Sequence, residues 1–159
     1  MQDRELDAFD LKILDELSKD GRVSWRDLAD RIGLSFSPTL RRVRRLEEEG
    51  TIRGYTASID EKRVLGSVQV FISVTLERQV KEILTRFEAK VEGMPEVIGG
   101  FLISGSSDYL LHAVVRDLAH YQAMLDQLTT IDGVARIQSN FAVKSFIRRS
   151  APLIRETGS

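Results

Sequence analysis

The sequence has no cysteine and, among its 159 residues, only three prolines and two histidines. The lack of cysteine excludes disulfides, thiolate metal sites and thiol catalysis, and it fits a reducing cytoplasm. No stretch approaches the run of roughly 18 apolar residues that crosses a membrane. Residues 1–4 are polar and charged, unlike the start of a secretory signal. We therefore expect a cytoplasmic protein with no membrane partner.

Positive and negative charges are nearly balanced, with a formal net charge of −1. This balance argues against a chain that coats nucleic acid indiscriminately. Phosphate attraction acts within about 8–10 Å, however, so the position of charges matters more than their sum. Between residues 35 and 46 there is no acidic residue but there are four arginines: Arg41, Arg42, Arg44 and Arg45. The sequence therefore predicts a local basic surface in the first third of the chain.

Capping signals predict three short helices in this first third. The first runs over about 8–19 after the N-cap Asp7, and the second follows Ser24 and stops at Gly33. A short turn then leads into a third helix over roughly 36–49. Two helices joined by a tight glycine-containing turn are typical of a DNA-binding helix-turn-helix.

On a helical wheel, the third helix separates an apolar side from a basic side. The predicted core side holds Phe36, Leu40, Val43 and Leu46, and the opposite side holds Ser37, Pro38, Arg41 and Arg45, with Arg42 and Arg44 on the flanks. Such a helix fits a major groove about 12 Å wide, where arginine pairs with guanine and flanking cations hold phosphates. An ordinary solvated face is the alternative. The predicted DNA contacts are Ser35, Ser37, Thr39, Arg41, Arg42, Arg44, Arg45 and Arg53.

Residues 50–55 indicate a tight turn into an extended strand. Arg53 lies in this stretch and either touches backbone phosphate or faces solvent. The strand is expected to link the helix-turn-helix, of the winged type, to the rest of the chain.

The remaining two thirds alternate between strand and helix patterns. Strands are predicted over residues 67–77, 97–104, 109–115 and 134–147, and helices over 80–91 and 118–130. This order is the ferredoxin-like βαββαβ arrangement, which makes the whole chain an α+β protein. The predicted domains are a helix-turn-helix over 1–54, a linking strand over 55–66, a ferredoxin-like effector-binding and oligomerisation domain over 67–148 and a tail over 149–159.

A sheet whose one face is covered by two helices needs cover for its other face. The first and last strands contribute Val68, Val70, Ile72, Ile137 and Phe141 to the sheet. Packing against a second copy of the sheet is the economical solution, and a dimer also pairs two recognition helices on DNA. We therefore expect at least a homodimer.

On composition alone, the polar loop Gly-Ser-Ser-Asp after the second strand is interpreted first as a favourable hairpin loop. The alternative is a site for an α-amino acid, because Gly105 lets the backbone approach closely and turn its N–H groups outward, and the carboxylate of Asp108 can accept from an ammonium. Only the family resemblance described below favours this alternative.

The sequence offers little for catalysis. The two histidines, His112 and His120, are interpreted as surface or packing residues, and there is no phosphate loop, nucleophile elbow or clustered metal-ligand spacing. We expect no catalytic residue, no metal site and no cofactor.

Nearly the whole chain resembles the leucine-responsive regulatory protein/AsnC family, the feast/famine transcription regulators. The matching stretches are Leu6-Asp7 through Asp10 with Ile13-Leu14, Lys19-Asp20-Gly21-Arg22, Gly33-Leu34-Ser35, Arg42-Val43-Arg44-Arg45-Leu46-Glu47, Gly50-Thr51-Ile52-Arg53-Gly54-Tyr55 and Ser104-Gly105-Ser106-Ser107-Asp108-Tyr109-Leu110. The resemblance implies a helix-turn-helix tied by a strand to an amino-acid-sensing domain. It also implies dimers formed through the sheets, which assemble into rings, commonly octamers.

The resemblance places the effector at the contact between dimers, beside the loop Gly105, Ser106, Ser107, Asp108 and Tyr109. Many relatives have an acid where this chain has Ser106. The expected function is therefore a sequence-specific DNA-binding transcription regulator that responds to a small effector, an amino acid above all, with duplex operator DNA as its partner. The alternative is a ligand-sensing assembly protein whose helix-turn-helix contacts protein.

Overall fold

The computed structural model describes residues 5–64, 66 and 68–147, in two compact units. The first unit contains the chain up to Ser58, and the second spans Ile59–Phe146. The tail predicted over 149–159 lies outside the described residues. None of the helices that the structure describes has the length and apolar composition needed to cross a membrane.

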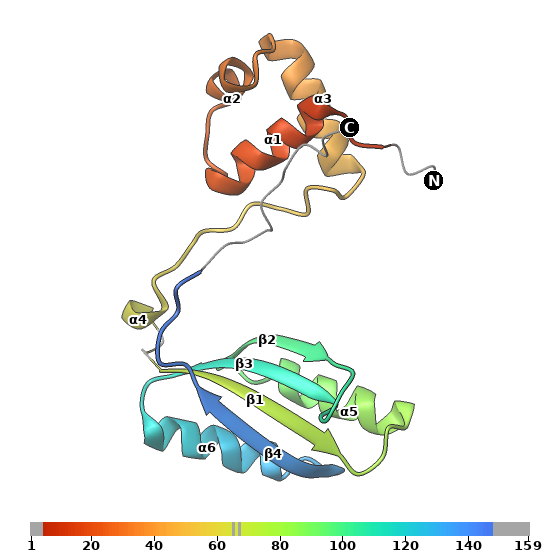
Figure 1. The fold of residues 1–159 in the computed structure, drawn as a ribbon, viewed down its shortest axis with the longest axis vertical. Helices are drawn as coiled ribbons and strands as arrows, with labels where there is room; N and C mark the ends of the chain where they lie inside the picture. The colour runs from red at the N-terminus through yellow and green to blue at the C-terminus, as the bar shows by residue number, and fades with distance from the viewer. Residues whose placement is uncertain (1–4, 65, 67, 148–159) are drawn as a thin grey trace. The chain divides into compact units, whose positions relative to one another are not determined.

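The first unit consists of three helices, α1 (Ala8–Lys19), α2 (Trp25–Ile32) and α3 (Phe36–Glu48), as predicted (Figure 1). Asp7 and Asp10 form a reciprocal capping box at the start of α1. Gly33 ends α2 with φ +74°, a left-handed conformation that favours glycine. Together these caps confirm the predicted bounds. The buried residues of its core are Ile13, Val23, Leu28, Ile32, Val43 and Leu46.

The predicted linking strand is not a strand in the described part of the chain. Residues 53–60 have no ladder hydrogen bonds, and a short helix, α4 (Glu61–Val64), follows them. A strand requires a neighbour to pair with, and the described residues provide none for this segment.

The second unit is a four-stranded antiparallel sheet with two helices, in the predicted βαββαβ order. Its strands are β1 (Val68–Leu76), β2 (Val97–Leu102), β3 (Tyr109–Val115) and β4 (Val134–Phe141), arranged as β2-β3-β1-β4. Its helices are α5 (Lys81–Glu92) and α6 (Leu118–Thr129). β4 ends before residue 147, where the prediction had placed its end, because its partner β1 begins at Val68 and offers no further backbone groups.

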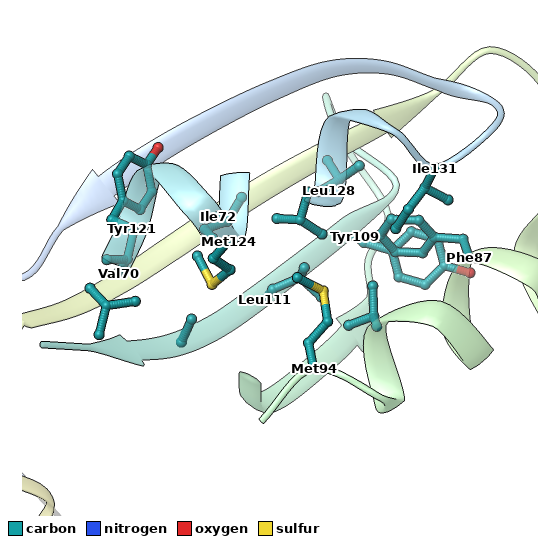
Figure 2. Close-up of a cluster of buried hydrophobic side chains, with 14 of the residues drawn as sticks. Val70, Ile72, Phe87, Met94, Tyr109, Leu111, Tyr121, Met124, Leu128 and Ile131 are labelled. Carbon is teal, nitrogen blue, oxygen red and sulfur yellow. The ribbon is translucent and has the colours of Figure 1, made fainter. Parts of the chain in front are cut away.

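One face of this sheet packs against α5 and α6. Val70, Ile72 and Val74 of β1 are fully buried there with Phe87 of α5 and Met124 of α6 (Figure 2). The register places Ile137 and Phe141 of β4 on this same helix-covered face, because they pair with Val74 and Val70. Of the sheet residues named from the sequence, Val70 and Ile72 thus belong to the domain's own core and Val68 and Ile137 pack against it, while Phe141 is 46% exposed.

The opposite face carries the alternate residues of the same strands. Phe71 stacks on His112 with ring centroids 4.5 Å apart, and Leu110 lies opposite Phe101, which is 59% exposed. This open sheet face is defined by Phe71, Phe101, Leu110 and His112.

Candidate functional site

The buried side of α3 consists of Thr39, Val43 and Leu46, all with 0% exposure. Thr39 can be buried because its Oγ1 donates a hydrogen bond to the Ser35 carbonyl at 3.0 Å. Phe36 was predicted to lie on this side, but it is 46% exposed. The side of α3 that packs in the core therefore includes Thr39 in place of Phe36. The predicted contact between Thr39 and DNA is inconsistent with the complete burial of this residue.

The opposite side of α3 is exposed and basic. Ser37, Arg41 and Arg44 are all exposed, and no ion pair involves Arg41 or Arg44 within the described residues. Ser35 is exposed at the N-cap, and its hydroxyl makes no capping hydrogen bond. Arg53, after the helix, is also exposed. These five residues have the accessibility that the predicted DNA contacts require.

Arg42 and Arg45 lie differently from the prediction. Nη1 of Arg42 is 2.6 Å from Oδ2 of Asp7 and 2.8 Å from Oδ1 of Asp10. Nη2 of Arg45 is 2.6 Å from Oδ2 of Asp10, which is 1% exposed. The expectation that Arg45 points away from the core is therefore wrong, because its long side chain turns back toward α1. A helical wheel represents one isolated helix, so it contains no information about partners on a neighbouring helix such as α1.

The contact between Asp7 and Arg42 shifts the pKa of both residues toward their charged forms. Partial burial acts to raise the pKa of Asp7, but hydrogen bonds from the Asp10 N–H and the Arg42 guanidinium outweigh it and lower that pKa. The hydrogen bond to Asp7 raises the pKa of Arg42 in turn. Arg42 also lies 5.6 Å from the centroid of the Phe9 ring.

The second site predicted from the sequence is the loop between β2 and β3. Gly105 has φ +147° and is exposed, as is Ser106, while Ser107 is half-buried. No atom lies within 4 Å of a Cβ built at Gly105, so glycine is required there by conformation and not by crowding. The outer part of the loop therefore presents backbone and hydroxyl groups to solvent.

Asp108 has a different role from the one expected. It is buried, and its Oδ2 accepts the Leu76 N–H at 2.6 Å while its Oδ1 accepts from Gln79 Nε2 at 2.5 Å. Its own N–H donates to the Val74 carbonyl. The carboxylate that was expected to accept from an ammonium already has donors from the chain itself. Asp108 ties the loop to the end of β1.

Tyr109 is also a core residue. Its ring packs against Phe87 with centroids 4.6 Å apart, and its hydroxyl donates to Oε1 of Glu88 at 2.8 Å (Figure 2). Burial, followed by the neighbouring Glu88 carboxylate, raises the pKa of Tyr109 well above its ordinary value. Tyr109 therefore anchors the loop from the inside.

Comparison with known proteins supports both halves of the chain. Residues 6–53 match the family model described as winged helix-turn-helix DNA-binding, and residues 69–152 match the one described as Lrp/AsnC ligand binding domain. The chain belongs to the Lrp/AsnC family. Members of this family are DNA-binding transcription regulators, and the chain has their fold.

Similar Lrp/AsnC proteins match over almost their full length. The Bkd operon transcriptional regulator of Pseudomonas aeruginosa is 56% identical, over 93% of this chain and 97% of its own. The leucine-responsive regulatory protein of Salmonella typhimurium is 38% identical, over 97% of this chain and 94% of its own. A transcriptional regulator from Neisseria meningitidis was solved in complex with L-methionine. Its structure has a TM-score of 0.88 and 37% identity, over 94% of this chain and 97% of its own.

The two histidines of this Lrp/AsnC chain have packing roles, as interpreted from the sequence. His112 stacks on Phe71 in the sheet. His120 Nε2 lies 2.8 Å from Oε1 of Glu96, and its Nδ1 accepts from the Arg116 N–H.

Sequence reasoning missed several residues that shape these sites. Asp7 was assigned to capping and Asp10 was given no role, although two acids three residues apart at the start of the first helix were available as a signal for arginine partners. Phe36 was assigned to the core, although an aromatic residue in the first turn of α3 can also contact a thymine methyl group. Gln79 and Glu88 had no sequence signal, because their partners lie 29 and 21 residues away.

Proposed function

We propose that the protein binds operator DNA through α3, the recognition helix, and that a small effector, an amino acid, changes this binding. Base edges are read by Ser37, Arg41 and Phe36, and backbone phosphates are held by Arg44 and Arg53 together with Ser35. The observation that carries this proposal is the exposure of Arg41 and Arg44 opposite the buried residues Thr39, Val43 and Leu46. Because the proposed partner is chromosomal DNA, we also propose that the protein is located in the cytoplasm.

DNA binding is tested by fluorescence anisotropy with duplexes from the promoter region of the chain's own gene and a random duplex. Arg41→Ala is expected to cost about 1–3 kcal/mol on a specific site, and Arg44→Ala to weaken all duplexes alike. Arg86→Ala, which removes the same charge from the exposed surface of α5, is the matched control and is expected to leave binding unchanged. Equal affinities for wild type and Arg41→Ala would overturn the assignment of α3.

Salt dependence separates this proposal from a helix-turn-helix that contacts protein. Displacement of counterions from DNA makes affinity fall steeply between about 50 and 200 mM salt. A protein-contact role predicts no such slope with DNA.

The effector proposed is an amino acid with an apolar side chain. The names of the relatives support this class, since one is leucine-responsive and another was solved with L-methionine. We place the carboxylate at the exposed backbone N–H groups and hydroxyls of Gly105, Ser106 and Ser107, with Asp108 and Tyr109 holding the loop in shape. A second wall from residues 138–142 of a neighbouring chain would complete the pocket.

Thermal shift with each amino acid tests the effector. A ligand at about 100 times its dissociation constant stabilises the folded state by about 2.7 kcal/mol. We expect L-leucine or L-methionine to raise the melting temperature and their D-enantiomers to leave it unchanged. A panel in which no amino acid shifts the melting temperature would remove the effector proposal and leave DNA binding untouched.

The assembly proposed is a homodimer through the open sheet face, with further association of dimers up to an octamer. Phe71, Leu110 and His112 supply apolar and aromatic surface on the two middle strands of that face, and Phe101 adds to it from the edge strand β2. A dimer presents two recognition helices, which matches operators with two half-sites.

A further inference from the structure

Two aspartates of α1 hold two of the four arginines of α3. Asp10 lies between both guanidiniums, with one carboxylate oxygen on Arg42 and the other on Arg45. Asp7 adds a second carboxylate to Arg42. The side chains of Arg42 and Arg45 keep 24% and 25% of their exposure, so both guanidiniums lie near the helix surface.

This arrangement halves the positive charge that α3 offers to DNA. The charges of Arg42 and Arg45 are offset within about 3 Å by the charges of Asp7 and Asp10, while Arg41 and Arg44 have no ion pair among the described residues. Arg42 donates through Nη1 and Arg45 through Nη2 to these carboxylates, so each guanidinium has fewer donors left for phosphate.

We propose that Asp10, assisted by Asp7, masks Arg42 and Arg45 from DNA phosphates and so limits the sequence-independent affinity of the recognition helix. The inference rests on the proposed binding of DNA through α3. The consequence is a larger ratio of the affinity for the operator to the affinity for random-sequence DNA. Phosphate contacts supply essentially all of the affinity for random-sequence DNA, so masking them lowers that affinity most.

Stability alone is a weak explanation of the network. Burying a carboxylate against guanidiniums costs desolvation, and well-packed apolar residues often replace such pairs without loss. The N-terminus of α1 needs only an N-cap and one reciprocal partner, which neutral residues also provide. A second function for these particular charges accounts for two acids at positions that face two arginines.

The test is Asp10→Asn, assayed by anisotropy with a random-sequence duplex at several salt concentrations. Asparagine keeps the size of the side chain but removes the charge, so Arg45 loses its close partner and keeps only Glu49, at 3.8 Å, while Arg42 keeps Asp7. One new phosphate contact, made by Arg45, steepens the dependence of log affinity on log salt by about 0.9. We expect tighter random binding at low salt, with the excess falling roughly three- to fourfold between about 50 and 200 mM salt.

A purely structural role predicts the opposite sign. A loosened α3 would bind more weakly, with an unchanged or shallower slope, and that result in folded protein overturns the proposal. Asp10→Asn combined with Arg42→Gln and Arg45→Gln is expected to return the slope to that of wild type. A slope that stays steep in this triple variant would also overturn it.

Two further variants complete the design. Asp15→Asn is the matched control, since it removes the same charge from α1 and leaves Lys19, which does not lie on α3, paired with Glu16 alone, so its slope is expected to equal that of wild type. Should Asp10→Asn fail to fold, Asp7→Asn decides, because asparagine is an equally good N-cap and the single carboxylate of Asp10 is then left to offset both arginines. One uncompensated positive charge again predicts a slope steeper by about 0.9, and an unchanged slope would overturn the proposal. Wild-type protein with no salt-dependent binding at all would instead refute the proposed function.

Discussion

The hydroxyl of Tyr55 donates a hydrogen bond to Oε1 of Glu47 at 2.9 Å. The ring of Tyr55 also packs edge-on against Trp25, with centroids 6.4 Å apart. The segment that leaves the helix-turn-helix is therefore attached to both α2 and α3. This contact holds the start of the linker against the recognition helix.

Tyr55→Phe removes this hydrogen bond and keeps the ring. We expect the free energy of unfolding of the first unit to fall by about 1 kcal/mol, the usual net value of such a bond. Trp25 is the only tryptophan of the chain, so its fluorescence during urea unfolding reports this unit. Tyr121→Phe, which removes a hydroxyl bonded to Ser139 in the sheet domain, is the control and should leave the Trp25 transition unchanged.

The phenol of Tyr55 should lose its proton at a higher pH than an ordinary tyrosine does. Burial, with the Glu47 carboxylate as second cause, raises the pKa of Tyr55 to about 12 from 10.0. The folded state thus favours the neutral phenol, so its contribution to stability is full below pH 10 and is lost as the pH rises through about 12. The difference in phenolate absorbance between wild type and Tyr55→Phe measures it, and a midpoint near 10 would contradict the contact.

Asp108→Asn should loosen the loop between β2 and β3. The amide keeps one acceptor oxygen but turns a donor toward either the Leu76 N–H or the Gln79 amide. A buried donor left without its acceptor costs about 1–3 kcal/mol, so thermal unfolding of the sheet domain, followed by circular dichroism, should begin earlier. Ser106→Ala, at an exposed position of the same loop, should melt as wild type does. Equal melting of Asp108→Asn and wild type would show that the carboxylate does not hold the loop.

Leu110→Glu should separate the proposed dimer. The side chain lies on the open sheet face opposite Phe101, where a charge would be buried without a partner in the dimer. Sedimentation velocity should show a monomer in place of the larger assembly. Gln122→Glu, on an exposed position of α6, adds the same charge elsewhere and should sediment as wild type; an unchanged Leu110→Glu assembly would place the interface on another surface.

Gly133→Ala should destabilise the sheet domain where Gly93→Ala does not. Gly133 has φ +87°, and a Cβ there would lie 2.8 Å from Cγ2 of Ile83. Strain of this kind costs about 1–3 kcal/mol. Gly93 has φ −77° and nothing nearer than 3.5 Å, so alanine is tolerated there. Similar melting temperatures for the two variants would indicate that the turn before β4 relaxes freely.

The sequence predicted the helices and strands well where local chemistry determines them. The Asp7 cap gave the start of α1, and Gly33 gave the end of α2. The end of β4 was wrong, because a strand ends where its neighbour ends and not where its own pattern stops. Local signals therefore define elements, while pairing defines their limits.

The side-chain roles were less predictable. Thr39 was buried in place of Phe36 because a threonine can satisfy its hydroxyl on the preceding turn, which apolar periodicity does not represent. Arg45 and Asp108 found partners 35 and 32 residues away in sequence, Asp10 and Leu76. Such contacts follow from the packing of elements, and residue type alone gives no direction for them.

The open sheet face has a quantitative consequence for regulation. If the cover of that face is another copy, the DNA-reading species is a product of mass action, so operator occupancy in the dilute limit rises with the square of protomer concentration. A modest change in synthesis or turnover would then produce a disproportionate change in transcription. The abundance of the regulator would itself act as an input, alongside any metabolite.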